Sequence, residues 1–468
     1  MPRPGLVAHT VLEGEETGIA AVAPVEERLL GAPIRVTSVH LSPRAMSRFR
    51  ISSLAFVAVA AALVVLSPLA RGDAAGEPAQ IVLQNGTKLT VETIADSLDT
   101  VWDMKWAPDG ELWFTQRNGR VSRLRVEDSV GKVIRVGTVP NVFERGEGGL
   151  MGFTFHPDFP QEPWIYFAHS YNPFATAQAA RGRGAARGRG AARGRGTAAQ
   201  RNEIRNRLVR IRYDSGKLGA VEVLIDSIPG GVNHNGAAVA VGPDRFLYVS
   251  LGDANKPDLA QDTASLNGKI LRLTLDGKPA PGNPWGNAVW SRGHRNPQGL
   301  AFHPTTGAMY SSEHGAGEED EINRIERGRN YGWPKVEGMC DKPEEEEFCR
   351  TELVVQPMAI VAPTAGLTAV NVYEFDAIPG WKGSLLATTL AGQALHRLTL
   401  SSNKRSVAAS ERLYEKEFGR LRDVLTDRYG AVYIATSNKD TRGKPVRTDD
   451  RIIRLRAEGK GERGEGGR

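Results

Sequence analysis

A unit that pairs a tight turn with an apolar strand recurs six times along this 468-residue chain. Its turns read APDG, HPDF, GPD, HPTTG, PGWKG and DRYG, and they begin at residues 107, 156, 242, 303, 379 and 427. The strands that follow include ELWFTQ, WIYFAHS and AVYIATS. Proline presets φ in such turns, Asp bonds back to the backbone and Gly takes positive φ, so each unit has the chemistry of a hairpin.

The spacing of the units, roughly 50 to 85 residues, is typical of four-stranded propeller blades with loop insertions. We see neither a strong helical period nor an alternation of strands and helices. The 52 Gly and 27 Pro also favour many short strands. We therefore predict an all-β fold over residues 80–457, a six-bladed β-propeller of four-stranded antiparallel blades. A pair of β-sandwiches is the alternative.

The N-terminal region has the three parts of a secretory signal. SRFR after Met46 is basic, ISSLAFVAVAAALVVLSPLA is apolar, and small residues follow. We predict a signal peptide over 46–75, cleavage between Ala70 and Ala75, and a periplasmic or secreted protein with no membrane span in its mature form. An uncleaved anchor is the alternative, because the apolar run approaches the length of a membrane helix. Residues 1–45 are expected to be an over-extended or disordered start.

The positive charge of the chain comes from one insert. Residues 179–199 contain six arginines in RG repeats, and the formal net charge of the chain is +6. The rest of the chain is therefore electrically balanced, which gives no support for a nucleic-acid partner. The insert and the tail over 458–468 are expected to be disordered. RNA binding by the insert is the alternative reading.

The two cysteines lie nine residues apart in a polar, acidic stretch, at Cys340 and Cys349. A single close pair in an exported chain favours a local disulfide over a metal site, which would need more ligands.

Polar residues flank several predicted strands. His234 precedes one strand, and Asp253 ends the next. A carboxylate that fixes the imidazole tautomer would make the histidine a proton acceptor, although a structural role is the common one for a histidine near a turn. Arg420 and Arg422 are two apart and would share one strand face. Like charges placed together require an anionic ligand or an internal salt bridge.

A third segment, SSEHGAGEEDEINRIERGRNYGWP, is rich in carboxylates and glycine. Carboxylates and free backbone carbonyls are the oxygen ligands that Ca²⁺ prefers, so this loop is a candidate calcium site; a solvated acidic loop is the alternative. Arg295 and Asn296 lie just before a further strand, in WSRGHRNPQGLAFHP.

Long motifs in the chain resemble one family. GEGGLMGFTFHPDF, LNGKILRLTLDGKPAPGNP, GHRNPQGLAFHPTTG and DEINRIERGRNYGWP are similar to the soluble glucose and aldose sugar dehydrogenases that depend on pyrroloquinoline quinone (PQQ). The resemblance runs from about residue 90 to about 457.

The resemblance implies specific roles. His234 matches the general base that removes the anomeric proton, and Asp253 matches the carboxylate that orients it. Carbonyls of Gly315 and Ala316 match those that hold the catalytic Ca²⁺. Quinone-binding positions match Arg295, Asn296, Arg420, Arg422, Leu259 and Glu147. A second, structural Ca²⁺ site matches Glu321, Tyr331 and Asp341.

Four positions depart from the family pattern. Glu147 replaces a Gln, Ala391 replaces a Lys beside the quinone, and Ala316 replaces a Pro. A Trp that stacks on the quinone has no aromatic counterpart in QPMAIVAPT, where Pro357 is the nearest match. Loss of a charge-assisted bond and of an aromatic stack is expected to weaken quinone binding, by about 2–4.5 kcal/mol.

We therefore expect an exported quinoprotein that oxidises an aldose to its lactone with PQQ and Ca²⁺. The chain has no haem-attachment CxxCH and no dinucleotide fingerprint, so an external electron acceptor is expected. The partners would be a small-molecule sugar and that acceptor, with dimerisation left open. A non-enzymatic Ca²⁺-binding propeller and a metal-dependent lactonase are the alternatives.

Overall fold

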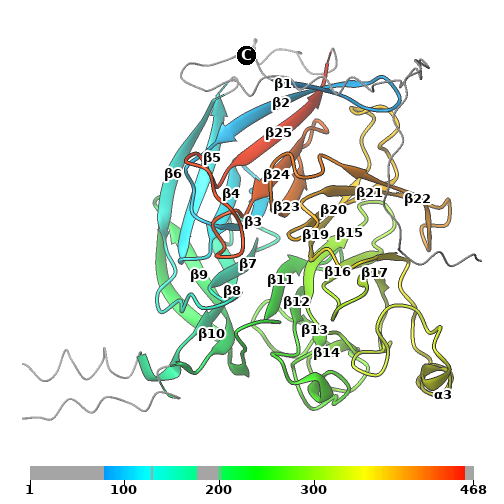
Figure 1. Cartoon of the computed structure of the whole chain (residues 1–468). Helices are drawn as coiled ribbons and strands as arrows, with labels where there is room; N and C mark the ends of the chain where they lie inside the picture. The colour runs from blue at the N-terminus through cyan, green and yellow to red at the C-terminus, as the bar shows by residue number, and fades with distance from the viewer. Residues whose placement is uncertain (1–78, 128–129, 176–199, 201, 459–468) are drawn as a thin grey trace, which may run out of the picture. The chain divides into compact units, whose positions relative to one another are not determined.

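The computed structural model describes residues 79–127, 130–175, 200 and 202–458. These residues form six antiparallel sheets around a central axis (Figure 1). The predicted six-bladed propeller is thereby confirmed. The predictions for residues 1–45, 46–75 and 179–199 lie outside the described residues, and so does all of the predicted tail 458–468 except Glu458.

Each blade begins with an inner strand. Blade 1 consists of β3 (Val101–Trp106), β4 (Leu112–Gln116), β5 (Arg120–Glu127) and β6 (Val130–Thr138). Blade 2 consists of β7 (Leu150–Phe155), β8 (Trp164–Tyr171), β9 (Arg205–Asp214) and β10 (Lys217–Pro229). Blade 3 consists of β11 (Gly236–Val241), β12 (Leu247–Leu251), β13 (Lys269–Leu273) and β14 (Val289–Arg292). Blade 4 consists of β15 (Pro297–Phe302), β16 (Met309–Glu313), β17 (Asp320–Ile325) and β18 (Ala359–Val361). Blade 5 is β19 (Leu367–Tyr373), β20 (Ser384–Thr389), β21 (Leu395–Leu400), β22 (Val407–Leu413).

Blade 6 closes the ring with strands from both ends of the propeller. It contains β23 (Leu421–Thr426), β24 (Val432–Thr436) and β25 (Ile452–Ala457), and then β2 (Lys88–Ala95) and β1 (Ala79–Val82). Strand β2 pairs antiparallel with β25, so main-chain hydrogen bonds join the two ends. Such closure leaves only short, protected sheet edges.

The six repeated units of the sequence are the second strands of the six blades. In five of them an aromatic side chain occupies the second or third strand position and is buried between blades: Trp113, Tyr166, Tyr248, Tyr310 and Tyr433. These large rings supply much of the apolar contact that holds neighbouring sheets together. This pattern of a turn and an apolar strand is local and repeated, so it can be recognised in the sequence.

Hydroxyl groups also join neighbouring blades. Ser250 Oγ on β12 donates to the carbonyl of Pro297 on β15 at 2.7 Å and accepts from Ala238 N at 3.0 Å. The second strands of three other blades use Thr115, Ser312 and Thr388 in the same way, each donating to a carbonyl of the next inner strand. Buried groups paired in this way fix the register between blades.

We expect Ser250→Ala to lower the free energy of unfolding by roughly 1–3 kcal/mol, because it leaves the buried Ala238 N–H without its acceptor. Ser311→Ala is the matched control, since Ser311 Oγ is equally buried and makes no hydrogen bond within the described residues. Chemical denaturation of both variants measures the difference. Equal losses would show that the inter-blade bond contributes nothing.

An ionisable cluster lies at the central axis. Lys105 Nζ donates to Asp103, Asp103 Oδ2 accepts from Phe153 N at 2.9 Å, and Asp423 Oδ2 accepts from Met104 N at 2.5 Å. The two carboxylates thus connect blade 6 to blade 1 and blade 1 to blade 2. They line a cavity of about 350 Å³ that also reaches Arg422.

The cluster predicts a pH dependence of stability. Burial, together with the charge of Asp103, raises the pKa of Asp423 to about 7. A carboxyl whose folded pKa lies above its unfolded value of about 3.9 stabilises the fold below that value, and the contribution is lost as the pH rises through 7. We expect Asp423→Asn to flatten the fall in unfolding free energy between about pH 4 and 7. Urea unfolding across that range tests this, with exposed Asp96→Asn as control; equal slopes would contradict it.

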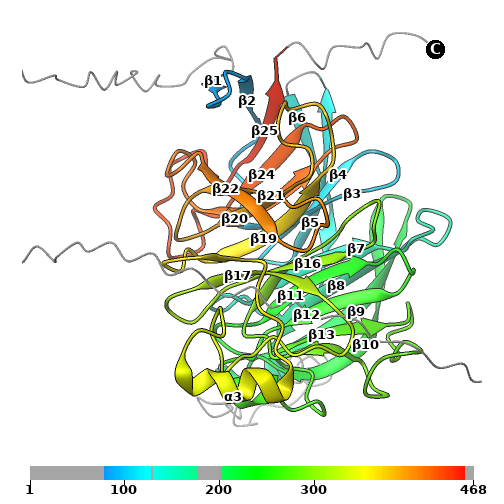
Figure 2. The same cartoon turned by 90° about the vertical axis from the view of Figure 1, so that its right-hand side faces the viewer.

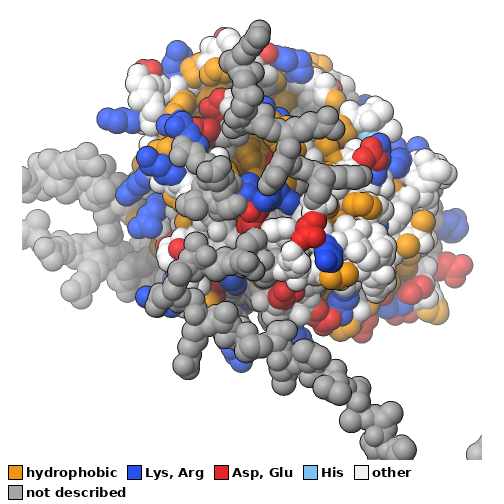
Figure 3. Space-filling model, turned by 90° about the horizontal axis from the view of Figure 1, so that it is seen from above, with side chains coloured by type: hydrophobic (Ala, Val, Ile, Leu, Met, Phe, Trp, Pro, Cys, Tyr) orange, Lys and Arg blue, Asp and Glu red, His pale blue; other side chains and the backbone are white. Residues whose placement is uncertain are grey.

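A disulfide joins Cys340 to Cys349, as predicted. It anchors α3 (Pro343–Glu352), which lies at the periphery of the propeller (Figures 1 and 2). Among the described residues no helix has the length and apolarity to cross a bilayer. Figure 3 shows the edge at the top of Figure 1, where the visible basic, acidic and apolar side chains are interspersed.

Candidate active site

The predicted site residues gather at one end of the propeller axis. His234, Asn296 and Arg420 lie at or just before the starts of the inner strands β11, β15 and β23, whereas Asp253 and His314 follow the ends of β12 and β16. Inner strands run in the same direction and second strands return, so starts of the former and ends of the latter meet at the same face. The repeat itself therefore assembles the site.

His234 and Asp253 form a hydrogen-bonded pair. Nδ1 of His234 lies 2.8 Å from Oδ1 of Asp253, whose side chain is fully buried. An ionised carboxylate can only accept hydrogen bonds, so beside ionised Asp253 a neutral imidazole carries its proton on Nδ1 and keeps a free lone pair on Nε2. Nε2 makes no hydrogen bond within the described residues, and the ring is 15% exposed. The imidazole can therefore accept a proton from a bound molecule.

The second oxygen of Asp253 accepts from Trp333 Nε1 at 2.9 Å, and the backbone N–H of Asn255 donates to Oδ1 at 2.7 Å. These bonds hold the carboxylate in the plane that His234 requires. Sequence reasoning missed Trp333, although it stands in the YGWP motif, because its contact with Asp253 spans 80 residues.

Glu147 fixes the backbone at His234. Its Oε2 accepts from His234 N at 2.9 Å and lies 3.5 Å from Asn296 Nδ2, while Oε1 pairs with Arg442 at 3.3 Å. His234 has φ = 58°, a conformation that few non-glycine residues adopt, so the bond to Glu147 helps to hold a strained position. The Glu that replaces the expected Gln is thus accommodated by a local cation.

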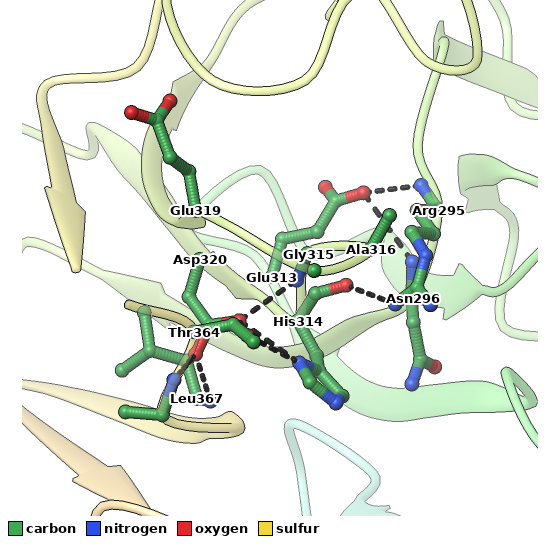
Figure 4. Close-up of polar contacts among 12 residues, drawn as sticks. Arg295, Asn296, Glu313, His314, Gly315, Ala316, Glu319, Asp320, Thr364 and Leu367 are labelled. Atoms are coloured by element: carbon green, nitrogen blue, oxygen red, sulfur yellow. Dashed lines mark hydrogen bonds and ion pairs between the residues drawn. The ribbon is translucent and has the colours of Figure 1, made fainter. Parts of the chain in front are cut away.

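Glu313 holds Arg295 and Asn296 in place. It accepts from both backbone N–H groups (Figure 4). Its other carboxylate oxygen pairs with His294 Nδ1 at 2.9 Å. Arg295 Nη1 donates to the carbonyl of His314 at 2.8 Å, and its guanidinium lies 5.4 Å from the Trp333 ring. Burial lowers the pKa of Arg295.

The two arginines of blade 6 have different partners. Arg420 pairs with Asp440 at 2.8 and 2.7 Å, which is the internal salt bridge that we left open. Among the described residues Arg422 has no carboxylate partner within hydrogen-bonding distance; its Nη1 donates to the neutral Gln298 at 2.7 Å. Burial lowers the pKa of Arg422 to about 10.

Two arginines at the site carry donors that a ligand could satisfy. The Nε–H groups of Arg295 and Arg422 are buried and make no hydrogen bond within the described residues. Buried donors without a partner are rare, and they indicate a missing ligand or water. An anion with several carboxylates, such as PQQ, fits this donor set.

The loop between β16 and β17 carries Gly315 and Ala316. Gly315 N donates to Asp320 Oδ1 at 2.8 Å, and Asp320 also accepts from Thr364 and from the backbone of Ala365 and Leu367 (Figure 4). A side chain at Gly315 would collide with the carbonyl of Glu319. The loop is therefore tightly built, with backbone carbonyls of the kind that Ca²⁺ binds.

No hydrogen bond joins any two of the three residues predicted for a second calcium site in the described part of the chain. Glu321 bonds to Gly338 N at 2.8 Å and to Asn323 at 2.7 Å, and burial near Glu313 raises its pKa to about 8. Tyr331 donates to a carbonyl at 2.7 Å, and Asp341 is exposed. The described residues contain no cluster of three His, Cys, Asp or Glu side chains able to hold a metal.

Three further positions can now be located. Leu259 is half-buried in the 3-10 helix Pro257–Ala260, and its carbonyl accepts from Lys269 at 2.7 Å. Ala391 is exposed in the turn that follows β20. Pro357, the nearest match to the quinone-stacking Trp, lies just before β18, whose other end at Val361 pairs with Asp320 at the site. Sequence alone could not place the strand between them.

Comparisons with known proteins identify the family of the chain. Residues 98–447 match the family model described as Glucose / Sorbosone dehydrogenase. Quinoprotein glucose dehydrogenase B of Acinetobacter calcoaceticus is 33% identical over 62% of this chain and 61% of its own length. Aldose sugar dehydrogenase YliI of Escherichia coli is 28% identical over 74% of this chain and 90% of its own. The PQQ-bound aldose sugar dehydrogenase from Streptomyces coelicolor superposes with a TM-score of 0.64 at 32% identity, covering 80% and 99% of the two chains.

Proposed function

The chain belongs to the glucose/sorbosone dehydrogenase family, and we propose that it is an exported quinoprotein that oxidises an aldose to its lactone. The observation that carries the proposal is the His234–Asp253 pair. Asp253 N donates to the carbonyl of Arg295, and Arg295 and Arg422 both have buried Nε–H groups without a hydrogen bond in the described residues. A proton acceptor next to an anion site is what PQQ-dependent oxidation of a sugar needs.

The chain's own residues account for the proton. An aldose would place its anomeric hydroxyl at Nε2 of His234, which would remove the proton while hydride leaves C1 for the bound quinone. The C1–O bond then becomes the carbonyl of the lactone. Asp253 stabilises the imidazolium that forms, and Trp333 and Asn255 keep Asp253 in place. The same imidazole can later release its proton to water.

The cofactors would bind across several blades. PQQ, when bound, supplies the two-electron acceptor for the hydride, and Ca²⁺ polarises its carbonyl as a Lewis acid. We assign its carboxylates to Arg295, Arg420 and Arg422, with Asn296, Leu259 and Glu147 lining the site. Carbonyls of Gly315 and Ala316 would hold the catalytic Ca²⁺. A structural Ca²⁺ at Glu321, Tyr331 and Asp341 remains part of the proposal.

Export, the acceptor and the segment boundaries complete the proposal. We propose a signal peptide over 46–75 and a mature periplasmic or secreted protein that passes electrons to an external acceptor. Relatives named as sugar dehydrogenases support the small-molecule substrate.

Steady-state turnover tests the function. Residues 76–468 are expressed, supplied with Ca²⁺ and PQQ, and mixed with a dye acceptor and a panel of aldoses. We expect dye reduction with at least one aldose, and one equivalent of lactone or aldonic acid for each two electrons. Hydrolysis of lactones without dye reduction would instead favour a lactonase, and Ca²⁺ binding without PQQ binding would favour a binding module.

A further inference from the structure

A carboxylate outside the predicted ligand set organises the calcium loop. Oε1 of Glu337 accepts from four successive backbone N–H groups, with N···O distances of 2.7, 2.9, 3.3 and 3.5 Å. The donors belong to residues 316–319, between β16 and β17. Successive N–H groups that converge on one point form an anion-binding nest. Here the anion comes from the chain itself.

The orientation of these N–H groups fixes the orientation of the carbonyls. Within a trans peptide the C=O and the N–H point in opposite directions. The peptides that follow Gly315 and Ala316 are trans, and their N–H groups point to Glu337. The carbonyl oxygens of Gly315 and Ala316 must therefore point to the opposite side of the loop.

The preceding peptide shows the same geometry directly. Its N–H, on Gly315, donates to Asp320 at 2.8 Å, whereas its carbonyl, on His314, accepts from Arg295 at 2.8 Å. Figure 4 shows Asp320 and Arg295 on opposite sides of this segment. Each of these three peptides is thus fixed by a carboxylate that accepts from its N–H: Asp320 for Gly315 N, and Glu337 for the next two.

We propose that Glu337 is a positioning residue for the catalytic calcium ion: it collects the N–H groups on one side of the loop and so turns the Gly315 and Ala316 carbonyls toward the metal. The inference rests on the proposed function, which places Ca²⁺ at those carbonyls. Without Glu337 the converging N–H dipoles would favour an anion, and either peptide could rotate. Partners that orient metal ligands typically contribute about 10- to 100-fold in metal affinity.

The test follows PQQ binding as a function of Ca²⁺ concentration, by the absorbance of the bound quinone and without substrate. We expect Glu337→Ala to raise the half-saturating Ca²⁺ concentration by roughly 10- to 100-fold and to recover full quinone binding at high Ca²⁺. Glu337→Gln keeps an acceptor oxygen, so its half-saturating Ca²⁺ concentration should lie closer to that of the wild-type protein. Glu318→Ala is the matched control, because it removes an exposed carboxylate from the same loop.

Each outcome decides the matter. The positioning role is overturned if the half-saturating Ca²⁺ concentration of Glu337→Ala equals that of Glu318→Ala. It is also overturned if the half-saturating Ca²⁺ concentration of Glu337→Gln equals that of Glu337→Ala. Circular dichroism checks folding, and Glu337→Asp carries the test if the alanine variant does not fold. A wild-type protein that binds no PQQ at any Ca²⁺ concentration overturns the proposed function and this inference with it.

Discussion

His234→Ala is expected to lower kcat for the preferred aldose by roughly 10²- to 10⁴-fold, the contribution of a general base. The Nε2 lone pair is the group that would take the anomeric proton, and alanine supplies no replacement. PQQ affinity should change little, because the contacts of His234 are with Asp253 and Glu147 rather than with the arginines of the anion site. Turnover and equilibrium quinone binding are measured on the same preparation.

His156→Ala serves as the control for this prediction. His156 follows the end of the inner strand β7, and therefore lies at the opposite end of blade 2 from the site. Its removal should leave kcat unchanged. A His234→Ala enzyme with wild-type turnover would remove the histidine from the mechanism.

Arg422→Met is expected to weaken PQQ binding by roughly 10- to 150-fold, the equivalent of about 1.5–3 kcal/mol for a lost charge-assisted hydrogen bond. Its guanidinium is buried and bonded to the neutral Gln298, and its Nε–H is unsatisfied. An anion is therefore the partner that this residue lacks. Equilibrium titration with PQQ in saturating Ca²⁺ gives the dissociation constant.

Arg420→Met is the matched comparison, two residues away. Asp440 already neutralises Arg420, so its removal should weaken PQQ binding less and lower the stability of the fold more. A larger loss of quinone affinity in Arg420→Met than in Arg422→Met would reverse our assignment of the two arginines.

The architecture was predictable because its signal is local. Every blade contains a hairpin turn followed by an apolar strand, and six copies of that unit can be counted without knowing any long-range contact. The closure of blade 6 was not predictable in this way, since nothing near residues 88–95 indicates that their partner is β25.

The helix Pro343–Glu352 shows another limit. It is strongly polar, with three glutamates in its first turn, so hydrophobic periodicity gave no signal for it. A proline at its first or second position and acidic residues after it were the start signals that could have revealed it.

For the site, residue types were easier to predict than partners. The His234–Asp253 contact agrees with the expectation from the resemblance. The salt bridge of Arg420 with Asp440, the bond from Trp333 to Asp253 and the nest around Glu337 all join segments whose proximity depends on the ring of blades. The position of Pro357 depends on the fold in the same way, because β18 lies between it and Asp320.

The central claim is tested most directly by a single-turnover experiment without oxygen or dye. The protein is loaded with Ca²⁺ and one equivalent of PQQ, aldoses are added one at a time, and the absorbance of the quinone is followed. We predict reduction of the bound quinone by at least one aldose, at a rate that His234→Ala lowers by roughly 10²-fold or more. Quinone that binds but is reduced by no aldose, or that fails to bind, would contradict the assignment as a sugar dehydrogenase.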